Sequence, residues 1–335
     1  PKSALFAVHR GNGEYDIDKD AFEALPDAKW GVQTAIKFEP LDKDVSKLYS
    51  WKLRAFATCQ FVGTMWERHC DGLLEAYDDQ QLSPVFSLSL SKARTEALKS
   101  PVQIFCSPSC YDNKCTFNAY YTRDYSGHGK GIFLPSYATS CGSRHASGSF
   151  FTVAHEAGHS ILDRFCPKYL DRVKATEDAI TKFLTKQKVI AQTLEQGLSQ
   201  FKPSILQDLT VAEYLSCRAL HEAFGDITAI LGSLSIAPNP SAVISRLNAD
   251  TCFLKVECSV GCARGPKTET RNPLNYHGRS LLLTRKFCDL LKAENERLGD
   301  GALATQIIAK RFLDLVFKAD YHRVPTPFET ILANL

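Results

Sequence analysis

Apolar residues recur at three- and four-residue steps in several parts of the chain, a spacing that places them on one face of an α-helix. Residues 149–162 show this pattern, with a serine and a threonine suited to the start of a buried helix. Residues 170–198 and 303–316 repeat the pattern, and a run from 44 to 77 comes close to it. We therefore predict helices in all four regions.

Shorter patterns predict strands in the N-terminal part. Residues 102–135 alternate aromatic and polar positions between turn-forming glycines, and residues 1–50 mix short apolar pieces with glycine and proline. At 335 residues, with 44% hydrophobic content, the chain can bury a large core and divide into two lobes. We expect an α+β fold, with a mixed α/β lobe over residues 1–148 and a mainly helical lobe over residues 149–335.

The first predicted helix contains the sequence His155-Glu156-Ala157-Gly158-His159. Two imidazoles four residues apart project from one helix face and can bind a single metal ion. Glu156 is turned away from them by about one helical step, which places its carboxylate beside the metal's open position as a general base. The pattern predicts one catalytic Zn²⁺. The alternative is a core helix that carries two hydrogen-bonded histidines.

Catalytic zinc requires a third protein ligand and leaves its fourth position to water. Glu222 and Asp226 lie four residues apart in an apolar stretch that predicts a second helix. We expect Glu222 to complete the zinc site. Asp226 would accept the outer N–H of a ligand histidine and so fix its tautomer. His221 is a rival third ligand, but it lies one helical step away from the ridge formed by Glu222 and Asp226.

This order of residues resembles the gluzincin metallopeptidases, in which a His-Glu-x-x-His helix is followed by a Glu-x-x-x-Asp helix. Further segments are similar to the thermolysin-like branch of that family. Upstream, an Asn-Ala-Tyr-Tyr segment resembles the family's edge strand, which holds an extended substrate by strand addition. The substrate-binding residues that the resemblance implies are Asn118, Ala119 and Tyr120.

The resemblance also implies roles in the chemistry. Residues 275–283 resemble the segment that carries the family's transition-state histidine, here His277. Tyr214 is an approximate counterpart of a family tyrosine, and both side chains would donate hydrogen bonds to the oxyanion. Arg271 would contact a substrate carbonyl. Peptide bonds would be hydrolysed with zinc as Lewis acid, while Glu156 takes the water's proton and delivers it to the leaving amine.

The chain also departs from the family pattern. Between His159 and Glu222 lie 62 residues, more than a compact thermolysin-like enzyme uses. We therefore expect an inserted helical subdomain over residues 167–212. A calcium site is not indicated, because the acidic residues near the N-terminus lack the glycine and distal glutamate of a helix-loop-helix site. Those residues are Asp16, Asp18 and Asp20.

Twelve cysteines, an even number, suggest up to six disulfides, an oxidising compartment and secretion. The rival interpretation is a structural zinc cluster formed by one of two cysteine groups, although neither has the paired Cys-x-x-Cys spacing that such sites prefer. These groups are Cys106, Cys110 and Cys115, and Cys252, Cys258 and Cys262.

Charge and hydropathy disfavour two classes of partner, nucleic acids and membranes. Forty basic and thirty-seven acidic residues give a net charge of +3 without a dense basic run, which disfavours nucleic-acid binding. No apolar stretch approaches the roughly eighteen residues that cross a bilayer, so we expect no membrane partner. The prediction is a secreted, monomeric zinc endopeptidase acting on peptides or proteins. The competing hypothesis is a binding or toxin-like effector that retains the zinc scaffold, and a narrow exopeptidase is a weaker third possibility.

Overall fold

The computed structural model describes residues 6–9, 54–66, 69, 102–106, 119–123, 131–134, 136–139, 142–191, 193–236, 238–249, 274–321 and 327–335. The chain divides into two compact units, Pro1–Ile161 and Leu162–Leu335. The boundary falls inside helix α4 (Phe150–Phe165), so this one helix contributes residues to both units. Most described residues are helical, and the strands lie N-terminal to α4, as the predicted α+β class requires.

A four-stranded sheet forms the β part of the first unit. Its order is β1 (Phe6–His9), β2 (Val102–Cys106), β4 (Gly131–Leu134) and β3 (Tyr120–Thr122). β1, β2 and β4 are parallel, whereas β3 runs antiparallel to β4. All four residues of β4 are buried, and such a continuous apolar run is typical of a strand covered on both faces. The strands predicted between residues 102 and 135 are confirmed in the described part.

A second, two-stranded antiparallel sheet leads into α4. Its strands are β5 (Ser136–Thr139) and β6 (Gly142–His145), and the short 3-10 helix η2 (Ala146–Gly148) follows them. Ser149 then caps α4, because its Oγ accepts a hydrogen bond from the Thr152 backbone N–H at 3.0 Å. The helix predicted over residues 149–162 is therefore confirmed, including its polar start.

A helix over residues 54–66 also belongs to the first unit. Its fully buried residues are Ala55, Cys59, Val62 and Trp66, spaced by four, three and four positions. This spacing places all four on one face and explains why the sequence pattern in this region favours a helix. The rest of the run from 44 to 77, apart from residue 69, lies outside the described residues.

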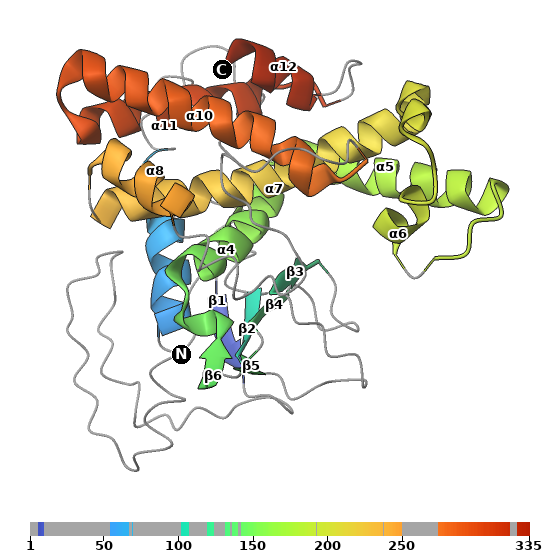
Figure 1. Cartoon of the computed structure of the whole chain (residues 1–335), viewed down its shortest axis with the longest axis horizontal. Coiled ribbons are helices and arrows are strands. Elements are labelled where there is room, and N and C mark those ends of the chain that lie inside the picture. Colours follow the sequence, from blue (N-terminus) through green and yellow to red (C-terminus); the bar gives the residue numbers. More distant parts are fainter. Residues whose placement is uncertain are drawn as a thin grey trace. The chain divides into compact units, whose positions relative to one another are not determined.

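Helices make up most of the described part of the second unit (Figure 1). The longest described helix is α7 (Leu209–Ile236), which packs against α5 (Pro167–Lys186), α10 (Tyr276–Leu298) and α12 (Pro327–Asn334). Most residues of α7 are buried, because it is apolar on nearly all sides. The second predicted helix, which carries Glu222 and Asp226, is thus confirmed.

The C-terminal helices follow sequence signals closely. α11 (Gly301–Lys318) contains the pattern predicted over residues 303–316, and the Asp300 side chain caps its start by accepting from two backbone N–H groups. Gly299 ends α10 with a left-handed φ of 67°, a conformation that glycine adopts without steric cost. α8 (Pro240–Ala249) packs against α7 and α10.

The inserted segment is not a single helix. α5 ends at Lys186, Lys188 has a φ of 57°, and the Ile190 side chain is 93% exposed. A new helix, α6 (Leu194–Leu198), starts after Thr193, and η3 (Pro203–Gln207) follows it. The prediction of helix over residues 170–198 is therefore wrong for residues 187–191, where a turn follows α5.

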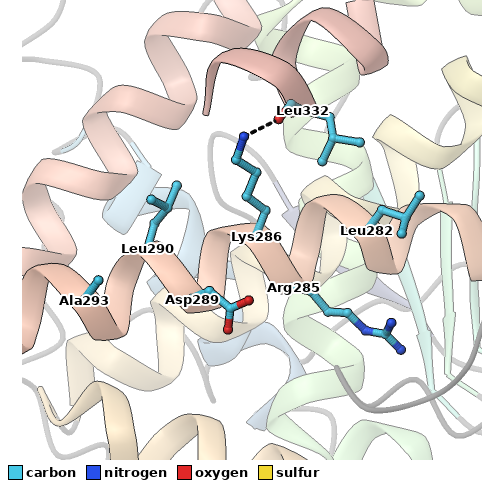
Figure 2. Close-up of a pocket in the computed structure, with 7 residues that line it drawn as sticks. All are labelled: Leu282, Arg285, Lys286, Asp289, Leu290, Ala293 and Leu332. Carbon is cyan, nitrogen blue, oxygen red and sulfur yellow. Dashed lines mark hydrogen bonds between the residues drawn. The ribbon is translucent and has the colours of Figure 1, made fainter.

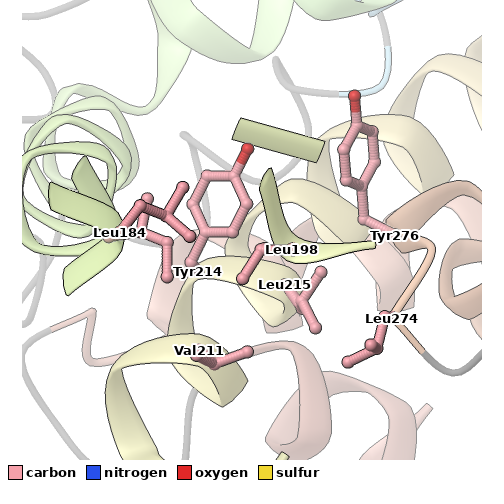
Figure 3. Packing of buried hydrophobic residues seen from close by; sticks show 8 residues of the cluster. Leu184, Leu198, Val211, Tyr214, Leu215, Leu274 and Tyr276 are labelled. Carbon is pink, nitrogen blue, oxygen red and sulfur yellow. The ribbon is translucent and has the colours of Figure 1, made fainter. Parts of the chain in front are cut away.

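The insertion shares its core with the rest of the second unit instead of folding as a separate subdomain. Side chains from α5 and α6 meet side chains from α7 and from the start of α10, as Figure 3 shows. The cluster consists of Ile180, Leu184, Leu198, Val211, Tyr214, Leu215, Leu274 and Tyr276. The position of α6 is therefore tied to α7 and α10 by apolar burial.

Four described cysteines, Cys59, Cys166, Cys217 and Cys288, are buried and form no disulfide. The prediction of up to six disulfides among the twelve cysteines is therefore wrong for these four. Each belongs to the core, where a free cysteine packs as a small apolar side chain. The cysteines of the two suggested structural zinc clusters lie outside the described residues, except Cys106, whose backbone belongs to β2.

A surface hollow lies along α10 beside α12 (Figure 2). Lys286 Nζ donates hydrogen bonds to the Leu332 and Ala333 carbonyl oxygens at 2.7 and 3.3 Å, which satisfies the C-terminal end of α12. The hollow contains none of the predicted site residues. It is lined by Leu282, Arg285, Lys286, Asp289, Leu290, Ala293 and Leu332.

Among the described helices, none is long and apolar enough to cross a membrane.

Candidate metal centre

Three predicted site residues lie together on α4. His155, Glu156 and His159 are each less than 8% exposed. The two imidazole centroids are 4.6 Å apart, and His159 Nε2 lies 3.9 Å from Glu156 Oε2. One turn of helix brings the two rings onto the same ridge, as the four-residue spacing requires. Ionisable side chains buried this deeply are uncommon without a function or a partner.

The edge of the four-stranded sheet lies beside this ridge. Within the described strands β3 pairs only with β4, and its Tyr121 ring centroid lies 6.4 Å from that of His159. Tyr120 is partly exposed and stacks on Phe133 at 4.7 Å. Ala119 is buried. Tyr120 thus belongs to the last strand of the described sheet, Ala119 precedes that strand, and Asn118 lies outside the described part of the chain. The binding of substrate by these residues stays a prediction.

The predicted carboxylates lie on the buried face of α7. Glu222 is 4% exposed and Asp226 1%. The Thr284 hydroxyl of α10 donates to Asp226 Oδ2 at 3.3 Å. This bond supports the carboxylate of Asp226 from the α10 side. The predicted hydrogen bond from a ligand histidine to Asp226 stays a prediction.

His277 lies in the first turn of α10, directly beside Glu222. Its Nε2 is 3.4 Å from Glu222 Oε2, and its Nδ1 is 3.8 Å from Glu195 Oε1. Asn275 caps this turn by accepting from the Gly278 N–H at 3.1 Å, which fixes where the helix begins. The structure thus brings together two segments that the sequence places more than fifty residues apart.

His221 has its own buried partners. Its Nε2 lies 3.5 Å from Asp163 Oδ1, and its ring stacks near that of Tyr169 with centroids 6.0 Å apart. The Tyr169 hydroxyl donates to the Cys217 carbonyl oxygen at 3.0 Å. These contacts tie the last turn of α4 to α5 and α7.

Two groups of buried side chains among the described residues each place three possible ligand atoms within 4.8 Å of one another: His155, Glu156 and His159, and His159, His221 and Glu222. Such groups could hold a metal ion, because donors around a tetrahedral zinc ion lie about 3.4 Å apart when each bond is about 2.1 Å long. The second group includes the rival ligand His221 beside Glu222. Neither group contains the predicted triad of His155, His159 and Glu222 as a whole, so that triad stays a prediction.

Tyr214 lies in the apolar cluster and not beside Glu222. It precedes Glu222 by eight residues, about 12 Å along a helix axis. Burial raises the pKa of its hydroxyl above the ordinary value. We therefore leave Tyr214 out of the proposed chemistry. Arg271 lies outside the described residues.

A half-buried arginine lies on the same helix as Glu222. The Arg218 guanidinium lies 4.9 Å from the ring centroid of Tyr276 and 3.6 Å from Glu177 Oε1. The coulombic interactions of Arg218 with Tyr276, Tyr214 and Glu222 raise its pKa against the opposing effect of burial. Arg218 therefore remains a cation one turn before Glu222.

Sequence reasoning missed Glu195, Asp163 and Tyr276. For Glu195 the sequence signals only the helix that carries it, since Thr193-Leu194-Glu195-Gln196 has the spacing of a capping box. The Thr193 hydroxyl accepts from the Gln196 N–H at 3.2 Å, which marks the start of α6. For Asp163 and Tyr276 we find no signal in the sequence beyond their nearness to the motifs.

Comparisons of the chain with family models, with curated proteins and with solved structures found no match. The resemblance to the gluzincin metallopeptidases therefore stays an expectation from the sequence motifs.

Proposed function

We propose that the chain is a zinc-dependent endopeptidase of the thermolysin-like kind, with a mixed N-terminal lobe and a helical C-terminal lobe. The observation that carries the proposal is the 3.4 Å contact between His277 Nε2 and Glu222 Oε2. Helix spacing predicts Glu222 as a metal ligand, whereas the family resemblance alone implies that His277 contacts the oxyanion. Their contact is what a shared active site requires.

The donor set fits zinc. Imidazole nitrogens and one carboxylate are its usual protein ligands in catalytic sites, and His155, His159 and Glu222 supply that set. His221 is the alternative to Glu222, since both belong to one metal-capable group. When bound, zinc supplies a Lewis acid that polarises the scissile carbonyl and makes water more acidic.

The chain's own residues would then move protons and hold charge. The Glu156 carboxylate accepts a proton from the attacking water and passes it to the leaving amine. The His277 imidazole donates a hydrogen bond to the oxygen that becomes negatively charged in the transition state. β3 offers an edge to which an extended substrate backbone can pair, beside His159. This edge favours internal peptide bonds over chain ends.

The substitution Glu156→Gln keeps the shape of the side chain but removes its ability to accept a proton. We expect about one zinc ion per chain in both parent and variant. The rate constant kcat for peptide cleavage should fall by at least about a hundredfold. Elemental analysis measures the zinc content, and cleavage of a diverse peptide library measures the activity.

Glu213→Gln is the matched control, because Glu213 pairs with Arg172 at 2.7 Å and contacts none of the proposed catalytic groups. It should retain both zinc and cleavage. A parent protein that binds zinc but cleaves no peptide would contradict the enzyme proposal and favour the binding or effector function. A parent protein that binds no metal would contradict both the endopeptidase function and the zinc-retaining effector function.

An extracellular location stays a prediction. It was inferred from twelve cysteines, and the four buried free thiols weaken that inference. The monomeric state and the peptide substrate are likewise part of the proposal.

A further inference from the structure

We propose that Glu195, on helix α6 of the inserted segment, is a positioning residue that orients His277 for the transition state. This inference rests on the proposed endopeptidase function. It assigns a role to the segment by which the chain departs most from a compact thermolysin-like enzyme.

The His277 ring lies between two carboxylates. Nε2 faces Glu222 Oε2 at 3.4 Å, while Nδ1 faces Glu195 Oε1 at 3.8 Å. The second distance is longer than a hydrogen bond but within the range of an ion pair. Because the two ring nitrogens point in different directions, a partner on Nδ1 restricts the rotation of the ring and the direction in which Nε2 points.

Glu195 is held in place by the packing of its own helix. Leu198 is fully buried in the apolar cluster, and the Thr193 hydroxyl caps the first turn. Gly197 is also buried, and a Cβ added there would lie 2.7 Å from Leu184 Cδ1, so α6 approaches α5 closely. A short helix with one end capped and one face buried can present a carboxylate at a defined position.

The charge on Glu195 agrees with this role. Its interaction with His277 is the largest cause that lowers the pKa of the Glu195 carboxyl below its ordinary value, and burial opposes it. The carboxylate is therefore ionised at neutral pH. A side-chain hydrogen bond from Tyr276, the neighbour of His277, also lowers the pKa of Glu195.

The experiment is a double-mutant cycle on the full chain. Glu195→Gln should lower kcat about tenfold with little change in KM, since a partner that orients a functional side chain typically contributes tenfold to a hundredfold. Glu195→Asp should restore part of the rate. In a His277→Ala background the same Glu195→Gln change should have no further effect on kcat. Glu213→Gln is again the control.

A second measurement does not depend on activity. In metal-free, ¹⁵N-labelled protein, Glu195→Gln should shift the imidazole resonances of His277, which the His277→Ala spectrum identifies. Glu213→Gln should leave them unchanged.

The outcomes separate the two proposals. If the parent cleaves no peptide but Glu195→Gln shifts the His277 resonances, the endopeptidase proposal fails and the orienting contact stands. If the parent is active and Glu195→Gln changes neither kcat nor the resonances, the positioning role fails and the endopeptidase stands. An equal loss of rate in the parent and His277→Ala backgrounds also overturns the positioning role, because Glu195 would then act without His277.

Discussion

Three of the described cysteines are buried so deeply that their thiols resist ionisation. Burial raises the pKa of the Cys166 and Cys217 thiols to about 11 and that of Cys288 to about 12. The thiolate is the reactive form, and an exposed cysteine titrates near pH 8.5. These three thiols therefore stay protonated across the range in which exposed cysteines ionise.

We predict that Cys166, Cys217 and Cys288 resist alkylation of the folded protein from pH 7 to 9.5. Their raised pKa values keep the thiols protonated, and their burial keeps the reagent away. The same thiols, together with Cys59, should react in denaturant without any reductant. Peptide mapping by mass spectrometry after iodoacetamide treatment checks both statements.

A free-cysteine peptide provides the internal control, because its alkylation rate should rise through the same pH range. Detection of any of the four cysteines only after reduction would mean that it forms a disulfide, and the secretion hypothesis would regain support.

At the element scale, α11 begins in a place where only glycine fits. A Cβ on Gly301 would fall against the Pro238 carbonyl oxygen and lie 2.7 Å from Pro240 Cδ. The start of α11 thus packs on the turn before α8. Because one of these contacts is with backbone, the chain cannot relieve it by a rotamer change.

We predict that Gly301→Ala lowers the free energy of unfolding by about 1–3 kcal/mol, despite the better helix propensity of alanine. Gly148→Ala is the control, since an added Cβ there meets nothing within 4 Å. Urea denaturation followed by circular dichroism measures the change. A Gly301→Ala protein as stable as the parent would show that the α8–α11 junction is looser than described.

The elements that the sequence predicted share strong local signals. α4, α7 and α11 have long apolar patterns, and Ser149 and Asp300 are caps of the preferred type. The turn after α5 was missed because Val189 and Ile190 continue the apolar spacing, although Ile190 is 93% exposed. The parallel pairing of β1 with β2 could not be predicted, since it joins residues 6–9 to residues 102–105.

The candidate site, too, was predictable only where its residues lie close together in the sequence. The two histidines and Glu156 could be found from one helical turn, because their chemistry depends on spacing along the chain. Glu195 could not be assigned to the site, because its role depends on a turn that returns α6 toward α10. A contact across eighty residues leaves no local pattern in a single sequence.

At the scale of the whole molecule, the proposed site is assembled from distant parts of the sequence. His159 and Glu222 are separated by 62 residues. An unfolded chain loses this arrangement, so a metal ion would bind the folded state much more tightly than the unfolded state. Preferential binding of this kind stabilises the folded protein by mass action.

We predict that a chelator lowers the melting temperature of the chain and that added Zn²⁺ restores it. At a free zinc concentration one hundred times Kd the gain is about 2.7 kcal/mol, which corresponds to a shift of about 4 °C for a protein of this size. Differential scanning calorimetry in zinc-buffered solutions measures the shift. In the proposed site Glu156 is the general base and not a ligand, so Glu156→Gln should retain the shift.

His159→Ala is the decisive comparison, because His159 is the residue common to both metal-capable groups. Without its imidazole, each group loses a donor, and the melting temperature should no longer respond to zinc. A variant that keeps the full response would place the metal elsewhere. In that case the two rings on α4 would be packing residues, and the proposed peptidase would lose its electrophile.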